Sequence, residues 1–236
     1  MPTNEAELTE SRVARLSARP GLPAHLASPG LQRLEIERRR VALLYVPETA
    51  LEQPRAPLAV MLHGAGGNAE HGMELLRAYA DDAGLILLSP ESRKSSWDII
   101  SDSQYGPDVR FIDSCLTEVF GQFAIDASKI ALGGFSDGAS YALSLGLSNG
   151  ALFQTILAFS PGFMAPVRIE DEPRIFISHG RADEILPIDA CGRRVRRALR
   201  SHPQLKLEYR EFEGPHTVPA EMKRAALEFF LGNESA

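Results

Sequence analysis

The sequence predicts an α/β protein in which a mostly parallel central sheet carries helices on both faces. Short apolar segments recur along the chain, and segments with apolar residues at three- and four-residue spacing lie between them. With 236 residues, 44% of them hydrophobic, the chain is long enough to bury one large core. We expect an N-terminal arm over residues 1–32, which are polar or rich in Ala, Pro and Gly, and a single domain over residues 33–236.

The first two strands are expected near a sheet edge, because residues 33–39 and 41–47 mix β-branched and aromatic residues with charges. Continuous apolar runs then predict buried parallel strands, each with its carboxyl end opening into a loop. These runs lie at 58–62, 85–90, 130–136, 155–161 and 174–180, and LKLEYREF at 205–212 predicts a last strand.

Helices are expected between the strands, over residues 71–84, 109–123 and 137–150, and a final helix over 219–232. The basic segment RRVRRALR at 193–200 favours the solvated face of another helix. About a dozen residues join the strands at 155–161 and 174–180, so no large lid domain is predicted.

The composition excludes several classes of function. A formal net charge of −6 gives no attraction to nucleic acid or anionic membranes. The N-terminal residues lack the apolar core of a signal peptide, and no later run approaches a membrane span, so we expect a cytoplasmic protein. Cys115 and Cys191 lie far apart without paired metal-ligand spacing, which favours reduced structural thiols and predicts no metal site.

The segment Gly134-Phe135-Ser136-Asp137-Gly138 matches the GxSxG pattern, in which a sharp turn between a strand and a helix exposes a nucleophilic serine. The bare pattern is weak evidence. Here an apolar strand precedes it and a helix rich in small residues follows, which makes it specific. We therefore expect Ser136 to be a nucleophile.

A serine nucleophile needs a histidine base and a carboxylate that orients the histidine. On this kind of fold the three residues occur along the chain in the order Ser, Asp, His. His216 follows the last predicted strand and is the expected base, whereas His179 and His202 are interpreted as structural or surface residues. Asp183 follows the strand at 174–180 and is the expected acid. Its competitors are Glu184, which should point away from its neighbour, and Asp189, which should cap the next helix.

The glycine-rich loop His63-Gly64-Ala65-Gly66-Gly67-Asn68 follows the strand at 58–62. Its small residues let the backbone approach an acyl group, and its N–H groups can form an oxyanion hole. We expect the N–H groups of Ala65 and Asp137 to be the donors, with Gly64 as the alternative to Ala65. A phosphate-binding loop is not predicted, because no Lys-Ser/Thr pair closes the motif.

LHGAGGN, GFSDGAS, HGRADEILP and GPHTVP occur in an order and spacing that resemble the phospholipase/carboxylesterase group of α/β-hydrolases, which includes acyl-protein thioesterases. The resemblance spans roughly residues 34–232 and implies the α/β-hydrolase fold, with Ser136, Asp183 and His216 as the triad and Ala65 and Asp137 as oxyanion donors. Asp137 stands where many thioesterases of the group carry Gln. An acidic side chain beside the nucleophile disfavours anionic substrates.

The resulting prediction is a serine hydrolase that acts through an acyl-enzyme, without a metal or organic cofactor, on small ester or thioester substrates with short to medium acyl chains. The alternatives are a serine peptidase or amidase on the same fold and a non-catalytic binding protein. The sequence leaves the oligomeric state open. The candidate walls of the cleft are Trp97, Tyr105, Phe163, Met164, Leu186 and Val218.

Overall fold

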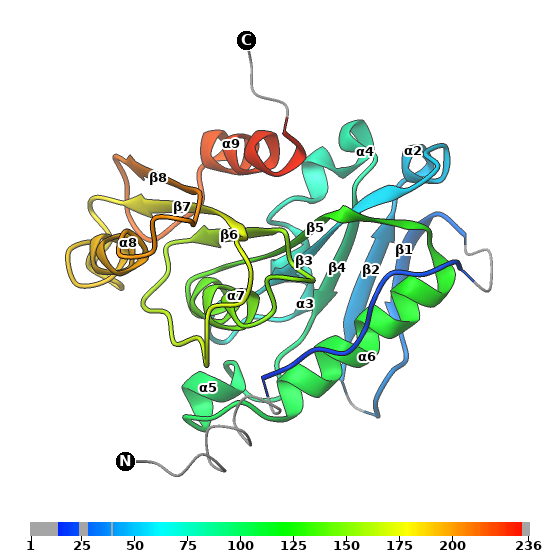
Figure 1. Ribbon diagram of the computed structural model, residues 1–236, viewed down its shortest axis with the longest axis horizontal. Coiled ribbons are helices and arrows are strands. Elements are labelled where there is room, and N and C mark those ends of the chain that lie inside the picture. The colour runs from blue at the N-terminus through cyan, green and yellow to red at the C-terminus, as the bar shows by residue number, and fades with distance from the viewer. Residues whose placement is uncertain (1–13, 24–27, 39, 233–236) are drawn as a thin grey trace.

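A computed structural model describes residues 14–23, 28–38 and 40–232, which contain one eight-stranded sheet (Figure 1). In spatial order the strands are β1 (Gly30–Leu34), β2 (Ala42–Val46), β4 (Ile86–Pro90), β3 (Ala56–Leu62), β5 (Ile125–Phe135), β6 (Thr155–Phe159), β7 (Arg174–Gly180) and β8 (Leu207–Phe212). The strands β1, β2 and β4 pair antiparallel, and every pairing from β4 across to β8 is parallel. The predicted fold class is confirmed.

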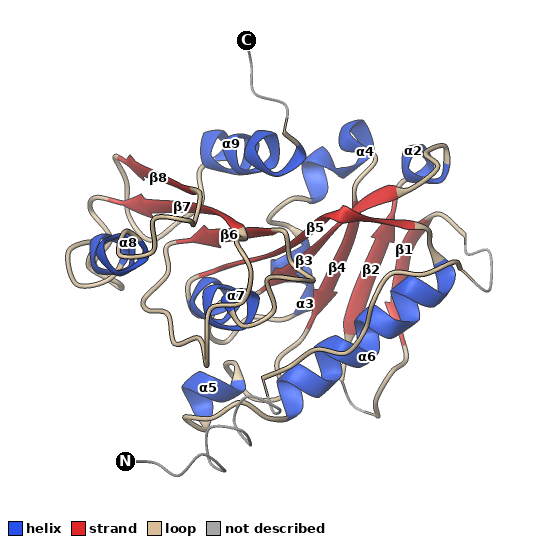
Figure 2. Ribbon diagram, viewed as in Figure 1, coloured by secondary structure: helices blue, strands red, loops and turns tan. Residues whose placement is uncertain are grey.

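Helices cover both faces of the sheet (Figure 2). On one face lie α6 (Pro107–Gln122), α7 (Asp137–Leu147) and α8 (Gly192–Leu199), and on the other α3 (Ala69–Met73), α4 (Ala80–Ala83) and α9 (Ala220–Leu231). Shorter elements are α2 (Glu48–Leu51), the 3₁₀ turn η1 (Arg77–Tyr79) and α5 (Asp98–Ser101). In the described ranges no helix has the length and apolar character needed to cross a membrane.

The central strands are buried on both faces, and this explains their continuous apolar sequence. The burial pattern is unbroken along β3, β4 and β6. Alternate residues of these strands contribute to core clusters on opposite sides of the sheet, so that Leu58 and Val60 pack toward α6 while Ala59 and Met61 pack toward α3 and α9. The sheet is therefore a rigid layer whose carboxyl ends carry the loops described below.

The single helix predicted over residues 71–84 is wrong, because the chain forms α3, η1 and α4 in its place. Met73, Leu75 and Leu76 are all buried. Successive helical residues are rotated by about 100°, so one straight helix would place Met73 and Leu75 on opposite faces. Breaking the helix lets all three side chains enter the core.

The segment expected as an arm differs from the prediction where the structure describes it, while residues 1–13 and 24–27 lie outside the described part. The first strand begins at Gly30, not at residue 33. Residues 14–23 run along α6 (Figure 1). Leu16 is fully buried in the core and donates its N–H to Asn149 Oδ1 (2.9 Å), while Asp113 of α6 accepts the N–H groups of Ser17 and Ala18 (2.8 Å each).

Replacement of Leu16 by Ala is expected to lower the free energy of unfolding by about 2–5 kcal/mol, since it leaves a cavity in the main core. Leu22→Ala is the matched control: the Leu22 side chain is 90% exposed, and its loss should change stability by less than about 0.5 kcal/mol. Urea unfolding of both variants measures the difference. Equal midpoints would show that residues 14–18 do not contribute to the folded core.

Candidate active site

Ser136 lies in the turn between β5 and α7 with φ of 58° and ψ of −119°, a left-handed backbone that is strained for a residue with a side chain. The flanking glycines are required by close packing. A Cβ on Gly138 would lie 2.3 Å from the carbonyl oxygen of Leu62, and a Cβ on Gly134 would lie 2.6 Å from the carbonyl group of Gly138. The packing of α7 against the ends of β3 and β5 therefore determines where Ser136 lies.

Ser136, His216 and Asp183 are joined by two hydrogen bonds. The Ser136 Oγ lies 2.9 Å from His216 Nε2, and Asp183 Oδ2 lies 2.6 Å from His216 Nδ1. Asp183 Oδ1 accepts the backbone N–H groups of Ile185 (3.0 Å) and Leu186 (2.8 Å). A carboxylate only accepts, so His216 carries its proton on Nδ1 and leaves Nε2 free to accept from the serine hydroxyl.

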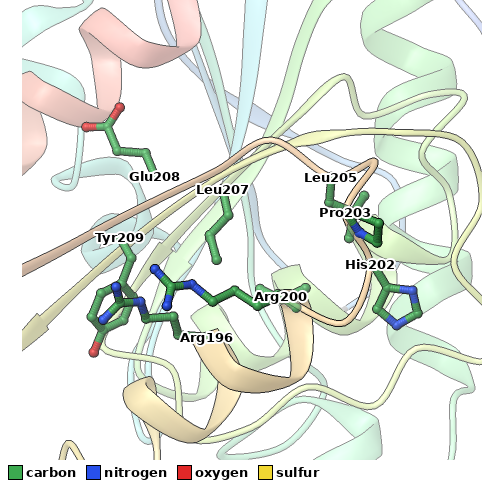
Figure 3. A pocket seen from close by; sticks show the side chains of 9 residues that line it. Arg196, Arg200, His202, Pro203, Leu205, Leu207, Glu208 and Tyr209 are labelled. Carbon is green, nitrogen blue, oxygen red and sulfur yellow. The ribbon is translucent and has the colours of Figure 1, made fainter.

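The competing acids Glu184 and Asp189, and also His202, lie outside the group formed by Ser136, His216 and Asp183. Glu184 is exposed, and Asp189 forms an exposed ion pair with Arg193 (3.0 Å). His202 borders a separate hollow of about 490 Å³ between α8 and β8 (Figure 3). That hollow is lined by Arg196, Leu199, Arg200, His202, Pro203, Leu205, Leu207, Glu208 and Tyr209. Within the described part of the chain, none of these residues forms a hydrogen bond with Ser136.

The glycine-rich loop after β3 closely approaches Ser136, since a Cβ on Gly64 would lie 3.3 Å from the Cβ of Ser136. Within the loop, Gly66 donates its N–H to Ser95 O (2.6 Å) and Gly67 to Gly64 O (3.0 Å). The backbone hydrogen bonds of the described chain include no acceptor for the N–H of Ala65. The N–H of Asp137, at the first position of α7, has no acceptor within the helix.

Residues 88–231 match the family model for phospholipases and carboxylesterases. The chain belongs to the phospholipase/carboxylesterase family. The matched region begins in β4 and ends in α9, so it includes Ser136, Asp183 and His216 but not the glycine-rich loop.

Other comparisons found proteins with a similar sequence or fold. A candidate esterase of Nocardia uniformis subsp. tsuyamanensis, NocK, is 32% identical over 144 residues, which are 56% of this chain and 42% of NocK. The chain thus spans less than half of that relative.

A phospholipase/carboxylesterase from Dyadobacter fermentans has a similar structure, with a TM-score of 0.63 and 20% identity over 87% of this chain and 99% of that one. An acetyl xylan esterase from Aspergillus awamori gives a TM-score of 0.68 at 16% identity, covering 85% and 98% of the two chains. The two structural likenesses show the α/β-hydrolase fold.

In this member of the phospholipase/carboxylesterase family, the His63 side chain holds the glycine-rich loop in place by hydrogen bonds. Its ring is buried, and burial lowers the pKa of the imidazole. His63 Nε2 accepts the backbone N–H of Ser92 (3.0 Å), so Nδ1 carries the proton and donates it to Gly64 O (2.7 Å). The carbonyl oxygen of His63 accepts the indole N–H of Trp97 (2.9 Å).

The loop between β4 and α6 is held by two buried carboxylates that the sequence analysis did not single out. Asp108 accepts from Arg40 Nη2 (2.6 Å) and from the backbone N–H of Asp98 (2.9 Å). Asp98 accepts the N–H groups of Gly106 (2.8 Å) and Asp108 (2.9 Å) and the hydroxyl of Tyr141 (2.9 Å). Burial, and then the charge of Asp108, raise the pKa of Asp98. Their acidic side chains gave no sequence signal because exposed carboxylates are far commoner.

The predicted cleft walls differ in exposure, and one of them, Tyr105, is partly buried and donates its hydroxyl to Ala165 O (3.0 Å). Trp97 is fully buried and stacks on Tyr141 with ring centroids 5.1 Å apart, so its assignment as a wall was wrong: the indole supports the loop and has no surface to offer a substrate. Phe163, Met164 and Leu186 are partly buried on the loops after β6 and β7. Val218 lines a hollow of about 380 Å³ together with His216 and the glycine-rich loop.

His179, interpreted as structural from the sequence, lies against Asp183. Both side chains are fully buried, and His179 Nε2 is 3.3 Å from Asp183 Oδ2 and 2.8 Å from the carbonyl oxygen of Leu186. Burial lowers the pKa of His179. The four-residue spacing between His179 and Asp183 around a strand end was the available sequence signal.

The buried histidines predict a loss of stability in mild acid. Because the folded-state pKa values of His63 and His179 are lowered, the unfolded chain binds more protons once the pH falls below about 6.5, and the free energy of unfolding falls by up to about 1.4 kcal/mol per pH unit for each histidine. His63→Gln should make urea-unfolding stability less dependent on pH between about 6.5 and 5. His202→Gln is the control and should show the same dependence of unfolding free energy on pH as the parent protein. If His63→Gln also showed the same pH dependence as the parent, a lowered pKa of His63 in the folded protein would be contradicted.

Proposed function

We propose that this protein is a serine hydrolase that cleaves carboxylic esters or thioesters through an acyl-enzyme, with Ser136 as nucleophile, His216 as general base and Asp183 as the orienting acid. The observation that carries the proposal is the chain of hydrogen bonds from Ser136 Oγ through His216 to Asp183, at 2.9 and 2.6 Å. Membership of the phospholipase/carboxylesterase family and the esterase names of several relatives support it.

In the first step, Ser136 Oγ attacks the carbonyl carbon and its proton moves to His216 Nε2. The negative charge that develops on the carbonyl oxygen is stabilised by the N–H groups of Ala65 and Asp137 and by the N-terminus of α7. The carbon–oxygen or carbon–sulfur bond then breaks as His216 donates its proton to the leaving group. The acyl group remains on Ser136.

Water completes the cycle by the same route. His216 Nε2 takes a proton from water as its oxygen attacks the acyl carbon, and the proton then returns to Ser136 Oγ as the acid leaves. Asp183 stabilises the imidazolium in both steps without taking a proton. Each oxyanion donor contributes about 10²- to 10³-fold in rate.

The substrates proposed are small and have an uncharged acyl group. The hollow of about 380 Å³ beside His216 is lined by the glycine-rich loop, Phe135 and Val218, and also by one acidic and one basic residue, Glu74 and Lys223. No large lid domain covers the described site. Asp137, which follows the nucleophile in the chain and is partly exposed, accepts a hydrogen bond from Ser96 Oγ (2.5 Å) and places a negative charge near Ser136. That charge repels a negatively charged group on the acyl chain of a substrate.

Ser136→Ala is expected to abolish labelling by a fluorophosphonate and to lower turnover of p-nitrophenyl butyrate by about 10⁶-fold, because no nucleophile remains. Ser201→Ala, at an exposed position after α8, is the control for serine content and should keep labelling. Mass spectrometry of the labelled peptide identifies the modified residue. Well-folded parent protein that neither labels nor hydrolyses esters, but binds them, would contradict the enzyme and favour a binding protein; faster turnover of p-nitroanilides than of esters would indicate an amidase.

Asp137→Asn is expected to raise turnover of an anionic ester relative to a neutral one. The ratio of kcat/KM for p-nitrophenyl hemisuccinate to that for p-nitrophenyl butyrate should increase by about two- to five-fold, since partly exposed charges interact by about 0.5–1 kcal/mol. Asp82→Asn removes the same charge from an exposed position on α4 and should leave the ratio unchanged. Equal ratios in Asp137→Asn and the parent protein would show that Asp137 does not act on acyl charge.

A further inference from the structure

His179 lies at the carboxyl end of β7, four residues before Asp183, and the loop between them turns back so that the two side chains touch. Both are fully buried. The His179 ring packs closely on the start of α8, because a Cβ on Gly192 would lie 2.5 Å from His179 Nδ1. A bulky neighbour is excluded there, and the ring is therefore held in one orientation.

The contacts of His179 establish its protonation state. The carbonyl oxygen of Leu186 accepts only, so His179 Nε2, 2.8 Å away, carries a proton. His179 Nδ1 is buried without a hydrogen-bond partner among the described residues, so a second proton there would have no acceptor. Burial lowers the pKa of the ring, and the nearby His216 acts in the same direction. Burial outweighs the hydrogen bond to Leu186 O and the charges of Asp183 and Glu211, which raise the pKa. His179 is neutral, with its proton on Nε2.

We infer that His179 is a positioning residue for the reaction: its Nε2–H donates to Leu186 O (2.8 Å) and so fixes the loop that holds the Asp183 carboxylate against His216. This inference rests on the proposed function. Asp183 Oδ1 accepts the N–H groups of Ile185 and Leu186, and Oδ2 accepts His216 Nδ1–H at 2.6 Å. His179 Nε2 lies 3.3 Å from the same Oδ2, so the ring also packs against the carboxylate.

The arrangement connects the loop that carries Asp183 to the sheet. Hydrogen bonds to Oδ1 come from the loop itself, and an Asp183 held only by its own loop would move with it. His179 belongs to β7, a buried strand of the sheet, and its hydrogen bond to Leu186 O connects the far end of the loop to that strand. An apolar side chain of similar size would fill the space but would leave Leu186 O without a donor.

The test compares His179→Leu, which removes the donor, with His179→Gln, whose side-chain amide supplies an N–H near the position of Nε2. All rates are expressed per active site titrated with a fluorophosphonate, so that loss of folded protein does not count. For p-nitrophenyl butyrate, His179→Leu should lower kcat by about 10- to 100-fold with KM changed less than about two-fold, as expected for a small misplacement of a catalytic group. His179→Gln should recover most of the loss, and His202→Leu should match the parent protein.

Two further readouts separate positioning from a purely structural role. In His179→Leu the acid limb of the kcat/KM profile should move to lower pH, because a less well placed carboxylate stabilises the His216 imidazolium less. A structural defect alone would leave the limb in place. In an Asp183→Asn background, His179→Leu should cause little additional loss of kcat, since the carboxylate it positions is gone.

Three results would overturn the inference: kcat within about two-fold of the parent in His179→Leu, an acid limb that does not move, or an undiminished loss in the Asp183→Asn background. His179→Met provides the same comparison if the leucine variant does not fold. These outcomes differ from failure of the proposed function, in which the parent protein itself would show no labelling at Ser136 and no ester turnover; His179 would then have no reaction to support, and the inference would fall with it.

Discussion

The close contact between the N-terminus of α7 and the carbonyl groups at the end of β3 is the constraint on which the site depends. With Gly138 packed against the carbonyl oxygens of Leu62 and His63, the chain between β5 and α7 has room for only one tight turn, and Ser136 takes the left-handed backbone at its apex. The same contact brings the glycine-rich loop, which begins at His63, alongside the serine. One packing contact therefore places Ser136 and the first turn of α7 beside the glycine-rich loop.

Buried polar groups stabilise the loops around Ser136. His63, Trp97, Asp98 and Asp108 link the loop after β4 to the loop after β3, and each group finds partners that offset the cost of removing it from water. On the other side of Ser136, Asp183 and His179 form a second buried polar group. Such networks favour one arrangement of the loops, because any alternative would leave several donors or acceptors unpaired inside the protein.

Much of the fold could be predicted from the sequence, because buried parallel strands are apolar throughout and the intervening helices keep their periodicity. The prediction failed where tertiary packing overrode local periodicity: Met73, Leu75 and Leu76 all enter the core, so the helix expected over 71–84 is broken. It also failed for Leu16, since the scattered apolar residues of its segment show no periodicity, and for Trp97, whose position after a strand end did not reveal that its ring is buried.

The sequence by itself determined the order of strands and helices, the glycine-flanked turn at Ser136 and the candidates Asp183 and His216, because these depend on local patterns and on the rule that parallel strands carry their loops at one edge. Only the tertiary structure decided that Ser136, His216 and Asp183 lie within hydrogen-bonding distance, that His179 packs against Asp183, and that the buried indole of Trp97 supports the loop. These are contacts between residues distant in the chain or across a folded loop. They depend on how strands twist and helices pack, which no local pattern specifies.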